Sequence, residues 1–400
     1  MKYRRTTSTA KQHGQVMTPP PLASALMERM SGEGQEWLEL GAGTGRIADA
    51  CIEFRTPTQY IGIEFDHRLI QSCKVSDVFD IRHVDVLNPA SLQTSLGQQM
   101  FSRVTGNPPY GVAALSVQAE ARLAELCPGL SSIRGWGQLD LYFVLESLAR
   151  LRRPGEAAFI VGAALAEDAR LESFRRHLVS AASEVECYEL PLDAYDKNVE
   201  VQSYLLVARF SQSGPCKVTV GRMRSGDFVI TDQRKISSEA ATIRLDLSYH
   251  QFSDVDAVLR SKRGTATLQE LGVSIVRGSR SKHEFRNLAL THFHTSDFPA
   301  HGMEIRFDHR PVDGFQLAES GDILLPRVGS RCLDRQAIVM SGCRPFTEAV
   351  YRLRLPVHSH QRVVDWISSE QGTSWRRGVA KGSCAKHVTV ASLQNMPVPI

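Results

Sequence analysis

The first half of the chain alternates two hydrophobic patterns. Short apolar runs of the kind that form buried strands are separated by stretches whose apolar residues recur at helical spacing, of which 139–151 is the longest. Strands separated by helices predict an α/β fold with a mostly parallel, doubly wound sheet. The runs that we interpret as strands are 35–40, 59–65, 81–87, 100–105, 156–161 and 201–210.

The second half of the chain lacks this rhythm. A polar break, S-Q-S-G-P at 211–215, predicts a boundary between one domain at 1–212 and another at 213–400. Beyond it, 323–340 and 349–356 have strand patterns, and 361–377 has a helical one. Strands and helices in irregular order predict a mixed α+β domain.

Composition places the chain among soluble globular proteins, with 42% hydrophobic and 22% charged residues. No run approaches the ~18 apolar residues that span a bilayer, so we expect no membrane association. The polar, basic N-terminus has no apolar core, so we expect no signal peptide. Eight cysteines are scattered without a C-x-x-C pair, which is typical of reduced, buried thiols and predicts a cytoplasmic protein.

The charge is distributed unevenly between the two halves. Residues 1–212 carry 21 Lys and Arg against 25 Asp and Glu, whereas residues 213–400 carry 26 against 18. Twenty of the 26 cations are arginines, which suit bidentate contacts with phosphate and guanine. The second half is therefore expected to meet a polyanion, with a solvated basic surface as the alternative.

A glycine-rich turn follows the first strand and precedes a helix. Gly41 and Gly43 in E-L-G-A-G-T-G would let a ligand approach the backbone at the carboxyl edge of the sheet. Glu64 ends the next strand, where a carboxylate can accept from ribose hydroxyls, and Asp85 ends the third, placed to accept from an adenine amine. Because the turn lacks G-x-G-x-x-G spacing, a nucleoside without pyrophosphate fits better than NAD. Strand-end acids that are merely solvated are the alternative.

The stretch N-P-P-Y follows the fourth strand. Two consecutive prolines exclude both helix and sheet interior, so Asn107, the Pro108 carbonyl and the Tyr110 ring are held stiffly side by side. If Asn107 and Pro108 each accept one N–H bond of an aromatic amine, the nitrogen lone pair turns out of the ring plane towards an electrophile. Pro109 fixes the direction of the Pro108 carbonyl, and Tyr110 offers a face for stacking. This is positioning with electrostatic stabilisation.

Together these motifs resemble the N6-adenine DNA methyltransferases of the gamma class, whose catalytic domain is amino-terminal and which occur in restriction–modification systems. The motifs that carry the resemblance, in order, are G-Q-V-M-T-P-P (14–20), E-L-G-A-G-T-G (39–45), G-I-E-F-D (62–66), H-V-D-V-L (83–87), G-N-P-P-Y-G (106–111) and L-D-L-Y-F-V-L-E-S-L-A-R-L-R-R-P-G (139–155).

The resemblance implies a Rossmann-like methyltransferase sheet of seven strands, followed by a target-recognition domain. It implies S-adenosylmethionine as cofactor, double-stranded DNA as partner and a base flipped out of the helix. Thr18, Glu39 and Gly41 would contact the methionine part, Glu64 the ribose and Asp85 the adenine. We expect a monomer, and the resemblance leaves open a cognate restriction endonuclease that acts separately.

Such enzymes close the second face of the flipped base with another aromatic side chain. Tyr195, just before the strand at 201–210, is the candidate, and a tyrosine that only packs is the alternative.

The segment 270–400 resembles the recognition domain of the same enzymes more loosely. Candidate groove or phosphate contacts are Arg327, Ser330, Arg331 and Arg335, and a solvated basic loop is the alternative for each of them singly. Histidines at 283, 292, 294, 301 and 309 lack cysteines at ligand spacing, so no zinc site is predicted.

Two other functions fit parts of this pattern. N-P-P-Y suits any planar –NH2, so a protein-glutamine or RNA methyltransferase is the first alternative. The basic second half is large for a peptide substrate and favours DNA. A catalytically inactive DNA-binding subunit is the second, and the intact motif set disfavours it.

Overall fold

The computed structural model describes residues 16–399 except 33–34, 75, 131–135, 196–200, 212–213, 310–311, 330–331 and 381–385. The chain forms two compact units, Met1–Leu247 and Ser248–Ile400. This division falls after Leu247, whereas the sequence predicts one after 212. Unit 2 retains a basic balance, with 20 Lys and Arg against 14 Asp and Glu.

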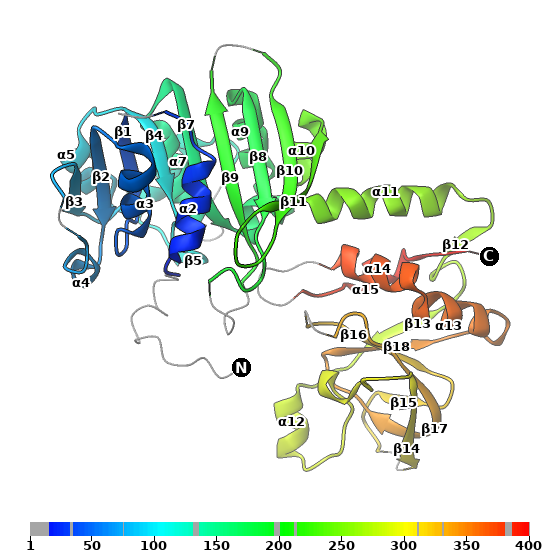
Figure 1. Ribbon diagram of the computed structural model, residues 1–400. Helices are drawn as coiled ribbons and strands as arrows, with labels where there is room; N and C mark the ends of the chain where they lie inside the picture. The colour runs from blue at the N-terminus through cyan, green and yellow to red at the C-terminus, as the bar shows by residue number, and fades with distance from the viewer. Residues whose placement is uncertain are drawn as a thin grey trace. The chain divides into compact units, whose positions relative to one another are not determined.

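Unit 1 is built around one sheet with helices on both faces (Figure 1). Its strands are β1 (Glu36–Leu40), β2 (Gln59–Glu64), β3 (Phe79–His83), β4 (Phe101–Gly106), β7 (Leu151–Gly162), β8 (Glu184–Glu189), β9 (Ser203–Phe210), β10 (Lys217–Met223) and β11 (Ile230–Ile236), with a separate hairpin of β5 (Val112–Ala114) and β6 (Trp136–Gln138). Its helices are α2 (Pro20–Glu28), α3 (Arg46–Arg55), α4 (His67–Ile70), α5 (Pro89–Leu96), α6 (Val117–Leu126), α7 (Leu139–Ala149), α8 (Ala163–Glu167), α9 (Glu172–Ala181) and α10 (Ser238–Ile243).

The strand order is β11-β10-β8-β9-β7-β4-β1-β2-β3. Strands β3, β2, β1, β4 and β7 run parallel, and β9 runs antiparallel to both of its neighbours, β7 and β8. The mostly parallel α/β sheet is confirmed, but the predicted count of seven strands is wrong. Strands β10 and β11, which lie beyond the predicted domain boundary, extend the sheet to nine.

The central strands are buried on both faces, as parallel strands are. Trp37 of β1 packs in the cluster that contains α2 and α3, whereas its neighbours Leu38 and Leu40 pack with α7. Strand β1 pairs with β2 on one side and with β4 on the other, so the chain order reverses there. At such a point the loops that leave the carboxyl ends diverge and open a crevice for ligands.

Unit 2 contains a six-stranded mixed sheet in the order β13-β18-β16-β17-β14, with β15 also paired to β17. Its strands are β12 (Thr265–Thr267), β13 (Ser274–Arg277), β14 (Glu304–His309), β15 (Leu317–Glu319), β16 (Ile323–Pro326), β17 (Ala337–Pro345), β18 (Val350–Arg354) and β19 (Pro397–Pro399). Its helices are α11 (Leu247–Ser261, whose first residue belongs to unit 1), α12 (Lys282–Asn287), α13 (His360–Ser368), α14 (Glu370–Val379) and α15 (Val390–Gln394).

The predicted strands of unit 2 are confirmed, but the single helix predicted at 361–377 is two helices. Ser369 ends α13 and caps α14 by accepting from the Gly372 amide at 3.0 Å.

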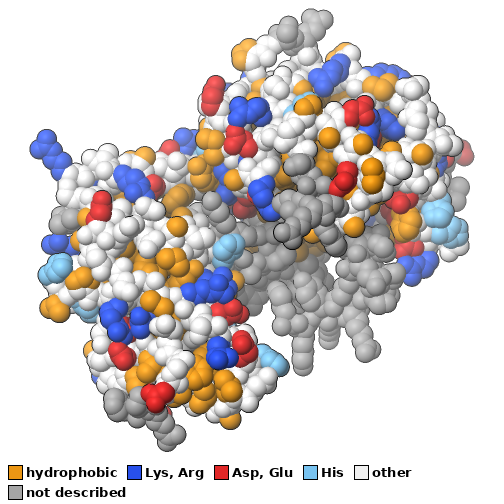
Figure 2. Space-filling view, turned by 180° about the vertical axis from the view of Figure 1, so that it is seen from behind, with side chains coloured by type: hydrophobic (Ala, Val, Ile, Leu, Met, Phe, Trp, Pro, Cys, Tyr) orange, Lys and Arg blue, Asp and Glu red, His pale blue; other side chains and the backbone are white. Residues whose placement is uncertain are grey.

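On the face of unit 2 seen in Figure 2, Lys and Arg side chains are dispersed among hydrophobic and acidic ones. Among the described residues, every helix falls short of the length and hydropathy of a bilayer-spanning segment. The cysteines among the described residues of both units are free thiols, and Cys384 lies outside the described residues.

Candidate functional site

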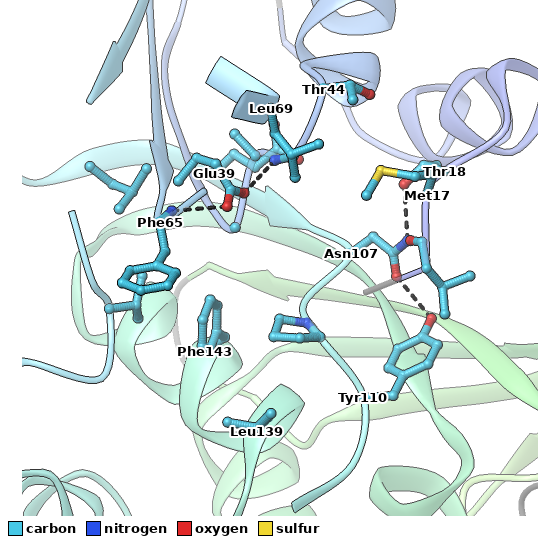
Figure 3. A pocket seen from close by; sticks show the side chains of 18 of the residues that line it. Met17, Thr18, Glu39, Thr44, Phe65, Leu69, Asn107, Tyr110, Leu139 and Phe143 are labelled. Carbon is cyan, nitrogen blue, oxygen red and sulfur yellow. Dashed lines mark hydrogen bonds between the residues drawn. The ribbon is translucent and has the colours of Figure 1, made fainter. Parts of the chain in front are cut away.

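A cavity of about 440 Å³ lies in unit 1 at the carboxyl ends of β1, β2 and β4, within the roughly 300–1,000 Å³ range of small-molecule sites. Figure 3 shows it from close by. Most of the residues predicted from the motifs meet here, namely Thr18, Glu39, Gly41, Gly43, Glu64, Asp85, Asn107, Pro109 and Tyr110. Pro108 and Tyr195 are not among the described residues that line this cavity.

The glycine turn forms one wall of this cavity. Gly41 and Gly43 have positive φ angles of 81° and 56°, which favour glycine. A Cβ at Gly43 would have only the Met17 Sδ within 4 Å, at 3.9 Å, so the backbone at Gly43 faces open space. The turn can therefore admit a ligand close to its backbone.

Glu39 lies at the base of the turn and is only 2% exposed. Its carboxylate accepts a hydrogen bond of 2.6 Å from the Tyr60 hydroxyl. Burial, with a smaller contribution from the nearby Glu64 carboxylate, raises the pKa of Glu39 to about 8. A cationic ligand in the cavity would favour the ionised form of this carboxyl group.

Glu64 ends β2 and holds the neighbouring backbone in place. One carboxylate oxygen accepts from the Gly43 amide at 2.7 Å, and the other from the amides of Phe65 and Asp66 at 2.9 and 2.8 Å. Asp85 lies two residues beyond the end of β3 and accepts from the Leu87 amide at 2.9 Å. Both acids line the cavity and are more than solvated strand ends, because each orders the loop that carries it.

Asn107 follows β4 and makes hydrogen bonds on both sides of its amide (Figure 3). Its Nδ2 donates to the Val16 carbonyl at 2.9 Å and to the Thr18 hydroxyl at 3.0 Å. Its Oδ1 accepts from the Tyr110 hydroxyl at 2.8 Å. The atom predicted to accept from a target amine thus already has a donor in this structure.

Tyr110 and Tyr195 meet at their hydroxyl groups, which form a short hydrogen bond. Their rings are 6.4 Å apart between centroids and inclined by 68°. Burial raises the pKa of both phenols, that of Tyr195 to about 12. The structure brings the two predicted aromatic side chains together, although they are not parallel.

Asp140, which the motif analysis did not single out, lies behind Tyr110. It is completely buried and accepts from the Gly162 amide at 2.9 Å and from the Gln138 side chain at 2.8 Å. A Cβ at Gly162 would lie 3.0 Å from Asp140 and 3.5 Å from the Tyr110 ring. Burial raises the pKa of Asp140 to about 6. Its sequence signal is an acidic residue at the start of an apolar helix.

The predicted DNA contacts of unit 2 fall into three groups. Arg327 is half-buried and donates from Nε to the Glu348 carbonyl at 2.7 Å, which gives it a structural task. Arg335 is exposed. Ser330 and Arg331 lie outside the described residues. In the part of the chain that the structure describes, no three His, Cys, Asp or Glu side chains are grouped to hold a metal ion.

No protein-family model matches the chain, and no curated protein does either. Among solved structures, the chain is similar to the type IIG restriction endonuclease BpuSI, with a TM-score of 0.48 and 13% identity over 98% of this chain and 60% of that one. It is also similar to a type I restriction–modification methyltransferase subunit from Streptococcus thermophilus, with a TM-score of 0.43 and 16% identity over 58% of this chain and 53% of that one.

A third similar structure is a putative class I S-adenosylmethionine-dependent methyltransferase from Listeria monocytogenes. The TM-score is 0.40, with 16% identity over 52% of this chain and 65% of that one. The chain thus spans less than two thirds of each of the three proteins. Its structural neighbours are methyltransferases and restriction–modification enzymes, and identities this low concern the fold alone.

Proposed function

We propose that this chain is an S-adenosylmethionine-dependent DNA methyltransferase that methylates N6 of an adenine flipped out of the duplex. The observation that carries the proposal is the position of Asn107. Its amide stands at the carboxyl end of β4, in the same cavity as the glycine turn, Glu64 and Asp85. An acceptor for an aromatic amine thereby lies next to a candidate nucleoside site.

The cavity residues fit S-adenosylmethionine. Glu64 and Asp85 offer carboxylate oxygens to ribose hydroxyls and the adenine amine, because Glu64 Oε2 and Asp85 Oδ1 each accept from one backbone amide and keep a further lone pair. Glu39 offers a buried carboxylate to a cationic group. When bound, this cofactor supplies a methyl group made electrophilic by its sulfonium.

The N-P-P-Y loop would then bind the adenine amine that receives the methyl group. Asn107 Oδ1 and the Pro108 carbonyl would each accept one N–H bond of the adenine amine and turn its lone pair out of the ring plane. Tyr110 would stack on the base, with Tyr195 on the other face. An adenine paired inside the duplex cannot reach these groups, so the base must be extruded, at a cost of a few kcal/mol.

Unit 2 would bind the duplex. Its basic balance and its exposed Arg335 support contacts with phosphate or base edges. A gamma-class enzyme of a restriction–modification system, acting as a monomer beside a separate endonuclease, is the finer form of this proposal. The order of the motifs along the chain supports this finer form.

The test is sequencing with modified-base detection of DNA from cells that express the chain, beside cells that express Asn107→Ala. We expect N6-methyladenine at one short sequence with the parent and none with the variant. If the parent protein is folded and binds S-adenosylmethionine but methylates RNA or a protein glutamine instead of DNA, then DNA is not its substrate. Methylation that persists in Asn107→Ala would contradict the mechanism.

A further inference from the structure

Ser203 of β9 is completely buried, and its side chain lies on the face of the sheet that carries Tyr110. It stands directly opposite Gly162 in the antiparallel pair of β7 and β9, and the side chains of opposite residues share one face of a sheet. A Cβ at Gly162 would lie 3.5 Å from the Tyr110 ring. The Ser203 hydroxyl is therefore directed to the side where the two tyrosines meet.

This hydroxyl has no hydrogen-bond partner among the described residues. Burial raises the pKa of the Tyr110 and Tyr195 phenols, and the nearby Ser203 hydroxyl acts in the opposite direction on both. A buried hydroxyl without a partner costs stability, and most buried polar side chains in folded proteins have one. An unused acceptor thus stands beside the two phenols.

The hydrogen bonds of the two phenols run in one direction. Tyr110 has a single hydroxyl hydrogen, which it donates to Asn107 Oδ1 at 2.8 Å (Figure 3). In the contact between the two hydroxyls, Tyr195 is therefore the donor and Tyr110 the acceptor. The hydrogen of Tyr195 thus depends on the Tyr110 oxygen for its acceptor.

Entry of a base must break this contact. A flat base between two rings needs them parallel and roughly 7–8 Å apart, because carbon atoms in contact are separated by about 3.5–4.0 Å. The rings of Tyr110 and Tyr195 have centroids 6.4 Å apart and planes inclined by 68°. We call this arrangement closed, and the one with parted rings open. On opening, Tyr195 loses its acceptor, and Ser203 Oγ has two lone pairs to offer instead.

We propose that Ser203 accepts a hydrogen bond from the Tyr195 hydroxyl when a base enters, and so stabilises the open arrangement. Ser203 is then a positioning residue, which acts on the base through Tyr195. The inference rests on the proposed function, because a base between the two tyrosines belongs to that function. A contact made in only one of two arrangements shifts the equilibrium towards it, here towards insertion of the base.

The test measures base insertion in Ser203→Ala, which removes the acceptor. The probe is a duplex with 2-aminopurine at the methylated position, as known from sequencing, bound to the full chain at saturation. Loss of one neutral hydrogen bond predicts a fall of about 2- to 12-fold in the ratio of inserted to stacked base. In a Tyr195→Phe background, which has no hydroxyl to donate, Ser203→Ala should leave this ratio unchanged. Ser203→Thr keeps the hydroxyl and should keep the parent ratio.

The stability of the free protein separates this role from a purely structural one. In the closed arrangement, Ser203 makes no hydrogen bond to a described residue that the variant could lose. The Tm of Ser203→Ala should therefore equal or exceed that of the parent. A lower Tm would show that the hydroxyl is already bonded before a base enters, and would overturn the inference whatever the chain methylates.

Two results with DNA would also overturn it. One is equal insertion in Ser203→Ala and in the parent. The other is the same fall with and without Tyr195→Phe, which would show that Ser203 does not act through the Tyr195 hydroxyl. A folded parent that inserts no base would refute the proposed function, and the inference with it. If Ser203→Thr does not fold, the comparison in the Tyr195→Phe background carries the test alone.

Discussion

Tyr110→Phe should make the base site easier to enter. The Tyr110 hydroxyl donates to Asn107 Oδ1 at 2.8 Å and is also hydrogen-bonded to the Tyr195 hydroxyl. The two rings are inclined by 68° with centroids 6.4 Å apart. A planar base between parallel rings needs them roughly 7–8 Å apart, since carbon atoms in contact are separated by about 3.5–4.0 Å. The rings must therefore part, and both hydroxyl contacts must break, before a base can stack.

The size of the effect follows from these two hydrogen bonds. A neutral intramolecular hydrogen bond contributes about 0.5–1.5 kcal/mol, so removing two destabilises the closed arrangement by about 1–3 kcal/mol. The equilibrium for base insertion should rise by roughly 5- to 150-fold. The Phe ring keeps the stacking face, and Asn107 keeps its place between Val16 and Thr18. The chemical rate should therefore change little.

The assay is the fluorescence of 2-aminopurine placed at the methylated position, once that position is known from sequencing. We expect a larger unstacked fraction with Tyr110→Phe than with the parent at the same saturation. Tyr195→Phe is the matched control, because it removes the contact between the two hydroxyls and leaves the one to Asn107, so its increase should be smaller. Unchanged or reduced fluorescence in Tyr110→Phe would refute the view that the hydroxyls hold the site closed.

Three other predictions concern the cofactor site, pH and DNA. Glu64→Ala should weaken S-adenosylmethionine binding by ~1–3 kcal/mol and also lower Tm, since it releases three backbone amides; equal calorimetric affinity would remove Glu64 from the site. Burial raises the pKa of Glu39 to about 8, above its value in the unfolded chain. The contribution of this carboxyl group to stability is thus full below the unfolded pKa and is lost progressively between that pKa and about 8, by up to about 1.4 kcal/mol per pH unit. Urea unfolding should show this loss in the parent and not in Glu39→Gln. Arg335→Ala should weaken DNA binding and reduce its salt dependence at unchanged Tm, whereas Arg327→Ala should lower Tm; the opposite pattern would reverse the two assignments.

The sequence predicted many of the residues that line the cavity of unit 1, because strand ends carry strong local signals. Glu39, Glu64 and Asn107 each stand at the end of an apolar run, and parallel strands bring their carboxyl ends to one edge. The strand count failed at β8, β10 and β11, which lie at one side of the sheet. In β11, five of the seven residues are exposed, so it lacks the apolar run by which the central strands were found.

The break in the helix predicted at 361–377 lies at Ser369, which caps α14. The apolar spacing continues through it, with Val364, Ile367 and Trp375 in one core cluster. A Cβ at Gly372 would lie only 2.1 Å from the Trp366 carbonyl, so the two helices approach each other more closely than any other residue would allow. Periodicity reports which residues are buried, and it cannot report such a close approach of two backbone segments.

The hydrogen bonds of Asn107 could not have been predicted for a related reason. Its partner in Val16 is a backbone carbonyl, which has no signature in the sequence, and its partner Tyr110 was expected to offer a ring face. These contacts lie on two different sides of the Asn107 amide. Val16 and Thr18, which line the cavity, accept from the –NH2 side of the amide, and the Tyr110 hydroxyl donates to its oxygen. An incoming adenine amine must replace the Tyr110 hydroxyl as donor to that oxygen while the other side stays fixed. Entry of the base should therefore depend on Tyr110 and Tyr195, whose hydroxyl contacts must break, and much less on the contacts that hold the –NH2 side of the amide.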